Sequence, residues 1–600
     1  MRRVPHIAWR LHGKNRCLRL KWSWWICLLV SPAIPARALE VQEFKWGFDG
    51  QVVPGRFNLV SILVANSSVV PFDGTVNFYK TRGLANRVGA AWRNPCYLSP
   101  LGGRWLQFYV FVDNQYDQWR LEWGRRADDH FDLDPPKWGA PAQVLLSDAS
   151  ATLTAVGAFK QFPEELFPPT VAATSGLDSV LLDHAPHWEP AKRQAFLSWL
   201  RAGGKVHLLR GANGSFPIFV DELGVLNLSA ERVRIGAGTL IRHNVTAREM
   251  RPADARDNDV LSESKPNNVV AFSQTSESFF QILAGLSQRH YNWAGIYLLA
   301  IAYVALMGPG NLMAGRKIAD YRLRILLLLA TIAGFAFLFN LAGRRGSGEA
   351  NVVHSLSYAR AIDGDTYDVM QWANVFAARG AHYTLTHAAP HDLYATGDEY
   401  EAVNGWIQNG KEGKFVVDIP MFSRRAFLHE AEMKGDTVSP NIVRWDGSKL
   451  VVSVSQDFAK QVLGGWMVRE DGIHTANIAN GQLEFDHSPE ESVESFAANA
   501  NTQQTQMAYQ YQYGPQNEPN AEEKRFRTLA NSLIVWSLGK GIGMEGWQNP
   551  NVSRPAREAV DFFLFARSPK SLGLAGGEFR EVGYVLYHFD LFKPETEGKL

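Results

Sequence analysis

The stretch GPGNLMAGRKIADYRLR, Gly308 to Arg324, lies between two long apolar runs. The run from Asn292 to Gly315 and the run from Ile325 to Gly343 contain no Asp, Glu, Lys or Arg, and each is long enough to cross a bilayer. We therefore predict a helical hairpin, with transmembrane helices at 291–315 and 325–343. The alternative, a hairpin buried inside a soluble protein, requires two consecutive charge-free helices of spanning length in one core.

The segment 316–324 predicts how the hairpin is oriented. Four basic residues outweigh Asp320 in this short loop: Arg316, Lys317, Arg322 and Arg324. Because short cytoplasmic loops are rich in Lys and Arg, the loop is predicted to be cytoplasmic and both large polar parts to be extracytoplasmic. Arg344 and Arg345, after the second span, weaken this charge bias without reversing it. Gly308-Pro309-Gly310 is expected to loosen or end the first helix.

The N-terminal residues 1–38 have the features of a signal peptide. A cationic start is followed by the apolar run WSWWICLLV, Trp22 to Val30, and by Ala36-Arg37-Ala38, a small-residue cleavage motif. An uncleaved anchor is the alternative, although the apolar run is too short to span a membrane. Cys17 and Cys27 lie inside this segment, so Cys96 alone follows it. This excludes an internal disulfide framework and a thiolate metal cluster, and we expect Cys96 to be a half-buried loop residue.

Composition and periodicity predict a chain of several domains. The formal net charge of +1 gives no sign of a nucleic-acid partner. Short alternating segments over 39–138 predict an immunoglobulin-like β-sandwich. Over 139–250 apolar strands enclose an amphipathic helix with Ala195, Phe196, Trp199 and Leu200 on one face, which predicts an open, flavodoxin-like α/β domain with a parallel sheet.

The remaining polar segments complete the predicted organisation. The Asn/Ser/Glu-rich stretch at 251–290 is predicted to be a linker, and 350–600 a β-rich extracytoplasmic domain. Within that domain the Gln/Asn-rich segment 487–524 is predicted to be a disordered loop, because its apolar content is low. Arg525 to Gly541 is predicted to be an amphipathic helix.

Three stretches together resemble a known group of proteins. They are DSVLLDH, FLSWLRAGGKVHLLRG and GPGNLMAGRK followed by an apolar span. This combination, from Ala142 to Arg345, resembles bacterial membrane proteins that carry a class I glutamine amidotransferase-like domain beside paired transmembrane helices. The resemblance implies a location in the bacterial inner membrane. It also implies an association with MoxR-type ATPases and von Willebrand A-type proteins, and therefore a role in envelope complex assembly or stress response.

The chain departs from the amidotransferase pattern at the nucleophile. That chemistry needs a cysteine at a strand-to-helix turn, activated by a histidine. The corresponding turn here is Arg210-Gly211-Ala212-Asn213-Gly214-Ser215, and the domain contains no cysteine. Ser215 lacks the surroundings of a nucleophile elbow. The sequence therefore predicts a domain of this class that has no amidotransferase activity and requires no cofactor.

A polar cluster at a predicted strand end is the remaining chemical candidate. Asp183, His184, His187 and Glu189 supply imidazole and carboxylate groups of the kind that bind zinc or manganese, although their spacing matches no common site. We expect a membrane-anchored binding or scaffolding protein of the bacterial envelope whose partner is another envelope or membrane protein. The alternatives are a metal-dependent hydrolase that uses this cluster and a transmembrane sensor. A transporter is disfavoured because the spans carry no ionisable residue.

Overall fold

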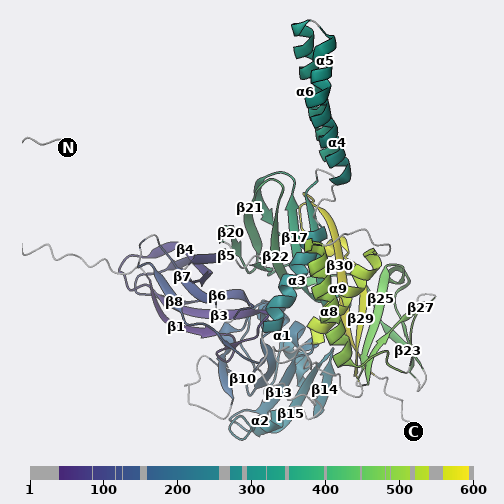
Figure 1. The fold of residues 1–600 in the computed structure, drawn as a ribbon. Helices are drawn as coiled ribbons and strands as arrows, with labels where there is room; N and C mark the ends of the chain where they lie inside the picture. The colour runs from purple at the N-terminus through teal and green to yellow at the C-terminus, as the bar shows by residue number, and fades with distance from the viewer. Residues whose placement is uncertain are drawn as a thin grey trace, which may run out of the picture.

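A computed structural model of the chain describes residues 39–592 with internal gaps. The gaps are residues 84–85, 115–116, 125, 127, 149–158, 256–269, 287–292, 319, 345–349, 398–401, 446–448, 470, 480–481, 487, 514–520 and 539–558. The predicted signal peptide, with Cys17 and Cys27, lies outside the described residues. Over the described residues the protein is β-rich, and it is built from several sheets with helices packed against them (Figure 1).

The N-terminal part is a β-sandwich. One layer has the strand order β1-β3-β6, with bounds Glu40–Trp46, Arg56–Ala65 and Gly103–Val112. The facing layer contains β4, β5, β7 and β8, with bounds Phe72–Arg82, Asn86–Leu98, Gln118–Glu122 and His130–Leu133. Aromatic rings fill the space between the layers: the ring centroids of Trp46 and Trp119 are 5.6 Å apart, and those of Phe78 and Phe108 5.0 Å. Cys96 lies in β5 and is buried, so the prediction of a half-buried loop cysteine is wrong.

The next part is an open α/β sheet with the strand order β11-β10-β12-β13-β15-β14. In chain order, β10 to β15 span Ala142–Ser147, Lys160–Pro163, Leu177–Leu182, Lys205–Arg210, Arg232–Ile235 and Gly238–Thr246. Neighbouring strands are parallel except for β14 and β15. Helix α1 (Pro190–Arg201) covers one face, with the predicted apolar side chains buried. Met250 and Ala255, the latter in α2 (Pro252–Ala255), pack against the other face.

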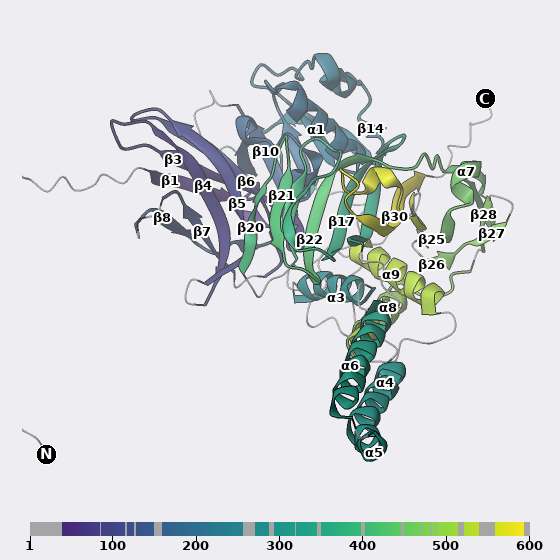
Figure 2. The same cartoon turned by 90° about the horizontal axis from the view of Figure 1, so that it is seen from above.

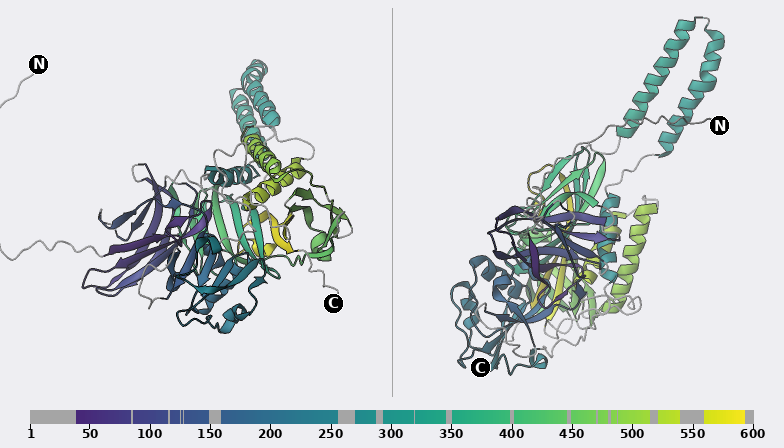
Figure 3. Two further views of the ribbon diagram at one scale, coloured as in Figure 1. Left: turned by 90° about the horizontal axis from the view of Figure 1, so that it is seen from below. Right: turned by 90° about the vertical axis from the view of Figure 1, so that its left-hand side faces the viewer.

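The C-terminal part is organised around a larger sheet with the order β19-β22-β17-β16-β30-β29-β25-β26. In chain order these strands span Val352–Asp363 (β16), Thr366–Ala377 (β17), Leu393–Thr396 (β19), Ser423–Lys434 (β22), Val462–Arg469 (β25), Gly472–Thr475 (β26), Ala559–Arg567 (β29) and Arg580–Phe592 (β30). A smaller sheet is made of β23 (Asn441–Trp445), β24 (Lys449–Ser453), β28 (Gln482–Asp486) and β27 (Asn477–Ala479). Figures 2 and 3 show α3, α8 and α9 beside one face of the large sheet.

Two of these helices contradict the sequence prediction. α3 (Val270–Leu286) lies in the predicted linker 251–290, and α8 (Val493–Tyr513) in the predicted disordered loop 487–524. Both predictions rested on the overall polar composition of the segment and did not consider the apolar residues that recur on one face of a helix. In α8 the buried residues recur at helical spacing: Val493, Phe496, Ala497, Ala500, Gln504 and Met507. In α3 they are Phe279, Phe280, Ile282, Leu283 and Ala284. α9 (Ala521–Leu538) covers most of the predicted amphipathic helix.

The N- and C-terminal parts are not separate domains, because they share a sheet. β5 of the sandwich pairs in parallel with β20 (Ala402–Gln408), which continues through β21 (Lys414–Ile419) to β18 (Ala381–Leu385). The Arg87 guanidinium donates to the carbonyl of Gly405 at 3.0 Å. The hairpin lies between these strands in the chain. Residues on both sides of the hairpin therefore lie on the same side of any membrane that it crosses.

The hairpin projects from this body (Figures 1 and 3). Two helices of spanning length and composition, Ala294–Lys317 and Tyr321–Leu341, are consistent with association with a membrane. Their apolar side chains are exposed, for example Leu298 by 72% and Phe337 by 67%. This degree of exposure is expected for lipid-facing residues and excludes a hairpin buried in a soluble core.

The helices of the hairpin differ in detail from the prediction. The first helix comprises α4 (Trp293–Ala305), a π-helical turn at Leu306–Gly310 and α5 (Asn311–Lys317). The Gly-Pro-Gly stretch thus widens the helix rather than ending it, because Pro309 lacks an N–H and the helix adjusts around it. α6 begins at Tyr321, so the predicted loop 316–324 is largely helical at both ends.

Candidate functional site

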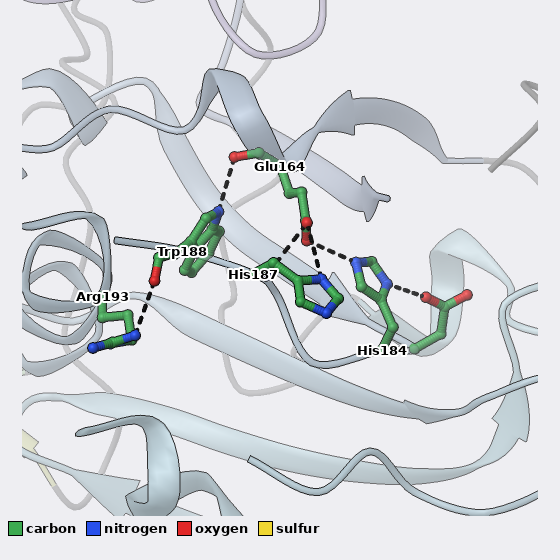
Figure 4. A network of polar contacts seen from close by, with 6 residues as sticks. Glu164, His184, His187, Trp188 and Arg193 are labelled. Atoms are coloured by element: carbon green, nitrogen blue, oxygen red, sulfur yellow. Dashed lines mark hydrogen bonds and ion pairs between the residues drawn. The ribbon is translucent and has the colours of Figure 1, made fainter. Parts of the chain in front are cut away.

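The predicted polar cluster is held together by a residue that the sequence analysis did not select, Glu164. This residue is buried in the short 3₁₀ helix Glu164–Leu166, next to the carboxyl ends of β10 and β12. His184 Nε2 lies 3.1 Å from Glu164 Oε2, and His184 Nδ1 lies 2.8 Å from Asp183 Oδ1 (Figure 4). His184 therefore lies between two carboxylates. Burial alone would lower the pKa of His184, but the hydrogen bonds to Asp183 and Glu164 raise it above its ordinary value.

The other two predicted residues have different positions. The backbone N–H of His187 donates to Glu164 Oε1 at 3.3 Å, and its Nδ1 lies 3.5 Å from the same oxygen, although its side chain is 80% exposed. Glu189 is the N-cap residue of α1, and its side chain makes no capping hydrogen bond. The Trp188 indole N–H donates to the Glu164 carbonyl at 2.8 Å (Figure 4). The four predicted residues do not converge on one point.

This geometry fits a hydrogen-bonded network better than a metal site. A histidine binds a metal through a ring-nitrogen lone pair. Both ring nitrogens of His184 face carboxylates, and a raised pKa favours the imidazolium, which has no lone pair to give. In the described part of the chain, these residues form no group of three ligand atoms within 4.8 Å of one another.

The turn after β13, where an amidotransferase nucleophile would stand, is closed by its own hydrogen bonds. The Ser215 hydroxyl donates to Asn213 Oδ1 at 2.8 Å, and the Gly211 N–H donates to the Ser215 carbonyl at 2.9 Å. The next regular element is the 3₁₀ helix Asp221–Asn227, so no α-helix starts directly at this turn. Ser215 thus lacks both a base and a strand-to-helix elbow.

A second cluster, missed by the sequence analysis, lies on the large sheet. Asp561 on β29 pairs across the strands with Asp590 on β30, and His588 lies two residues before Asp590 on the same face. His588 Nε2 is 3.2 Å from Asp561 Oδ1, and its Nδ1 is 2.5 Å from the Tyr358 hydroxyl. Ligand atoms of the three residues lie within 4.8 Å of one another, so they could hold a cation. We refer to Asp561, His588 and Asp590 as the β29–β30 cluster.

The positive charge next to the β29–β30 cluster comes from a residue of β16. Arg360 Nη2 lies 3.3 Å from Asp590 Oδ2. Burial raises the pKa of Asp590, but Arg360, His588 and the hydrogen bond with Asp561 together hold this pKa below its usual range, whereas burial raises the pKa of Asp561. Asp561 therefore carries the proton when the two carboxyls share one. A divalent cation bound by Asp590 would have to compete with Arg360.

The same face of the sheet carries a further set of buried charges. Burial raises the pKa of Asp368 on β17 to about 6 and that of Glu430 on β22 well above its usual range. Arg56, from the first residue of β3, interacts electrostatically with both and stacks 3.8 Å from the centroid of the Trp536 ring. Ser175 of the α/β part donates to Glu430 Oε1 at 3.2 Å. Together with Ser175, the buried charges of Arg56, Asp368 and Glu430 join the sandwich, the α/β part and the large sheet.

The sequence contains a signal for the β29–β30 cluster and for Arg360 beside it. Charged residues interrupt otherwise apolar strands at inward-facing positions, as in SYARAI, AVDFFLFAR and VLYHFDLF. Buried charges are uncommon unless they are paired, so such positions mark a polar contact inside the protein. Pairing across strands distant in sequence decides which residues meet, and periodicity does not reveal it.

Comparisons with known proteins do not assign the chain to a family. No model of a protein family matches it, and no curated protein matches it. A solved structure similar to part of the chain is the cycloisomaltooligosaccharide glucanotransferase of a Paenibacillus species complexed with cycloisomaltoheptaose. The match has 9% sequence identity and a TM-score of 0.16, and it covers 76% of this chain and 90% of that one. So low a TM-score does not indicate a common fold.

Proposed function

We propose that this chain is a membrane-anchored, extracytoplasmic binding or scaffolding protein of the bacterial envelope, without amidotransferase activity. The observation that carries the proposal is the exposed helical hairpin on a body whose two halves share one sheet. An immunoglobulin-like sandwich and an amidotransferase-like α/β domain are the finer assignments of its parts. The bacterial inner membrane is the proposed location.

The sidedness of the body follows from the charges at the hairpin tip. Arg316 and Lys317 end the first helix, and Arg322 and Arg324 begin the second. Basic residues at a tip of this kind favour the cytoplasm, which supports an extracytoplasmic body. The shared sheet argues against the transmembrane sensor, because a sensor of that kind requires the halves on opposite sides.

A binding role is supported by an apolar surface next to the carboxyl ends of the parallel strands. The segment after β13 exposes four apolar side chains, Ile218, Val220, Val225 and Leu228, with Ile218 exposed by 80%. Ligands of open α/β sheets bind at this edge, and clustered exposed apolar side chains favour protein partners. We therefore assign this segment to contact with another envelope or membrane protein.

The topology is tested by labelling single cysteines in a Cys96→Ala background with a membrane-impermeant maleimide. Lys137→Cys and Glu412→Cys, one in each half of the body, are expected to label in intact cells whose outer membrane admits the probe. Asp320→Cys at the hairpin tip is expected to label only after permeabilisation. The parent without an added cysteine measures the background. If Lys137→Cys and Glu412→Cys label only after permeabilisation, the extracytoplasmic assignment is wrong.

The binding surface is tested by placing a photo-crosslinking amino acid at Val220 and, as a control, at the exposed Asp457. A discrete adduct from position 220 alone supports the proposal, whereas equal yields at both positions contradict it.

A metal-dependent hydrolase is the second candidate, at the β29–β30 cluster rather than at the predicted residues Asp183 to Glu189, because the β29–β30 cluster brings three possible ligand atoms together. Metal analysis of the purified chain separates the possibilities. Stoichiometric zinc or manganese that is lost on His588→Ala assigns a metal to the β29–β30 cluster, and loss on His184→Ala assigns it to the predicted residues. Either result would replace the scaffold assignment with a metalloprotein.

A further inference from the structure

One turn of the body lies close to the point where the chain leaves the hairpin. β16 begins at Val352, eight residues after the end of α6 at Arg344. Val352 pairs with Phe376 of β17, and Phe376 pairs with Arg424 of β22. Val352 and Arg424 are therefore two strand spacings apart, which corresponds to about 10 Å. The start of β22 is therefore near the membrane end of the large sheet, and Figure 1 shows the end where β21 and β22 are joined on the side of the hairpin.

The turn between β21 and β22 presents two apolar side chains outward. Met421 is exposed by 62% and Phe422 by 54%. Phe422 has a positive φ of 56°, which is rare for a bulky residue. Its N–H donates to the Ala377 carbonyl at 2.8 Å, and the Ser423 hydroxyl donates to the Pro420 carbonyl at 2.7 Å. The conformation is thus fixed by hydrogen bonds while the side chains point away from the core.

Basic residues flank these apolar side chains. Arg379, in the turn after β17, and Arg424, at the start of β22, are both exposed. The acidic residue nearby, Asp418, is engaged by His382 Nδ1 at 2.6 Å and by the Asn404 amide at 2.6 Å. Apolar side chains rimmed by arginines fit an interface of acyl chains and anionic headgroups.

We propose that Met421 and Phe422 enter the headgroup region of the same bilayer that the hairpin crosses, with Arg379 and Arg424 contacting anionic phospholipid. This inference rests on the proposed membrane anchoring and adds a second contact to it. A second contact beside the hairpin would restrict the tilt of the body relative to the membrane. The surface after β13 is then held in a defined direction relative to the membrane.

The test uses the full chain with all three cysteines replaced by alanine, reconstituted in phospholipid nanodiscs. A single cysteine at Met421 or at Lys434 carries an NBD fluorophore. Lys434 is the matched control, because it ends the strand β22 that starts beside the turn, about 37 Å away. The nanodiscs contain phosphatidylcholine with or without phosphatidylglycerol, and with or without lipid that carries a quenching doxyl group close to the headgroup.

We expect the probe at position 421 to lose fluorescence with the doxyl lipid, the loss to be greater with phosphatidylglycerol, and the probe at position 434 to be unaffected. Retention of the chain in the nanodisc without quenching at position 421 overturns this inference alone. A blue-shifted probe that lipid does not quench also overturns it, because a protein then covers the turn. Equal quenching with and without phosphatidylglycerol refutes the role of the arginines. Failure of the chain to enter the nanodisc overturns the membrane anchoring as well.

Discussion

Replacement of Arg56 by methionine tests how the parts of this protein are held together. Arg56 belongs to the sandwich, but its guanidinium stacks on Trp536 of α9 and interacts with Asp368 and Glu430 of the large sheet. Methionine retains an unbranched apolar stem against Trp536 and removes the charge. Asp368 and Glu430 then lose a nearby cation. Removal of one partner from a buried ion group typically costs about 3–5 kcal/mol of the free energy of unfolding.

The cost of Arg56→Met is expected to depend on pH. Burial raises the pKa of Asp368 to about 6 and that of Glu430 well above its usual range. A carboxyl whose pKa is raised in the folded state contributes stability below its unfolded pKa and loses that contribution as the pH rises through the folded pKa. Without Arg56, Asp368 loses one of the two arginines that stabilise its charge at pH 8, whereas at pH 5 it takes up a proton. The loss of stability is therefore larger at pH 8.

Urea unfolding of the detergent-solubilised chain at both pH values measures this difference, with tryptophan fluorescence as the signal. The double variant Arg56→Met/Asp368→Asn is the control, and it is expected to recover part of the loss at pH 8 because the Asp368 carboxylate is gone. An equal loss at both pH values, or no recovery in the double variant, would refute an electrostatic role for Arg56.

Three further changes test other contacts. Gly236→Ala is expected to destabilise the fold more than Gly83→Ala: the two glycines have φ of +63° and +62°, but a Cβ at Gly236 would lie 2.8 Å from the Arg201 carbonyl oxygen, whereas no atom lies within 4 Å at Gly83; equal thermal midpoints would contradict this contact. The stability lost on His184→Gln is expected to be greatest below pH 6.5 and to decline as the pH rises through the raised pKa of His184. Denaturation across pH 5–9 measures this loss. A loss that increases with pH would contradict the pairing of His184 with two carboxylates. Burial raises the pKa of Asp392 to about 7. Between pH 4 and 7 the free energy of unfolding is therefore expected to fall less in Asp392→Asn than in the parent. Parallel curves of unfolding free energy against pH would show that Asp392 is charged in the fold.

The features predicted correctly depend on neighbouring residues in the chain. The hairpin follows from two uncharged apolar runs, and α1 follows from a helical stripe that ends at Gly203-Gly204. The parallel strands around α1 were likewise predicted from apolar runs of strand length. In each case the physical cause, burial of a continuous or periodic apolar face, operates within about twenty residues.

The features missed depend on residues that meet only in the folded chain. The sequence of β5 does not indicate that it pairs with β20, and the sequence of β20 does not indicate it either. Glu164 contacts His184 from a different loop. The segment of α8 was predicted to be disordered because its apolar content is low. Alanine and isolated apolar residues at helical spacing are nevertheless enough to pack one face of a helix whose other faces are polar. The charges of the β29–β30 cluster and of Arg360 could have been suspected because they interrupt apolar strands, but the pairing of Arg360 with Asp590 could not.

The shared sheet also has a consequence for biogenesis. Arg87 and the Val403 carbonyl that it contacts are separated by 316 residues, and the hairpin is made between them. At ribosomal speeds this interval lasts roughly 15 to 60 s, during which β5 is an open edge able to recruit a foreign strand. Completion of the sandwich must therefore wait for the far half of the polypeptide, after the hairpin has emerged. A chaperone that shields the nascent β5 edge would protect the protein from aggregation during this interval. A chain truncated before β20 would keep the backbone N–H and C=O groups of that edge unpaired and prone to pairing with other chains.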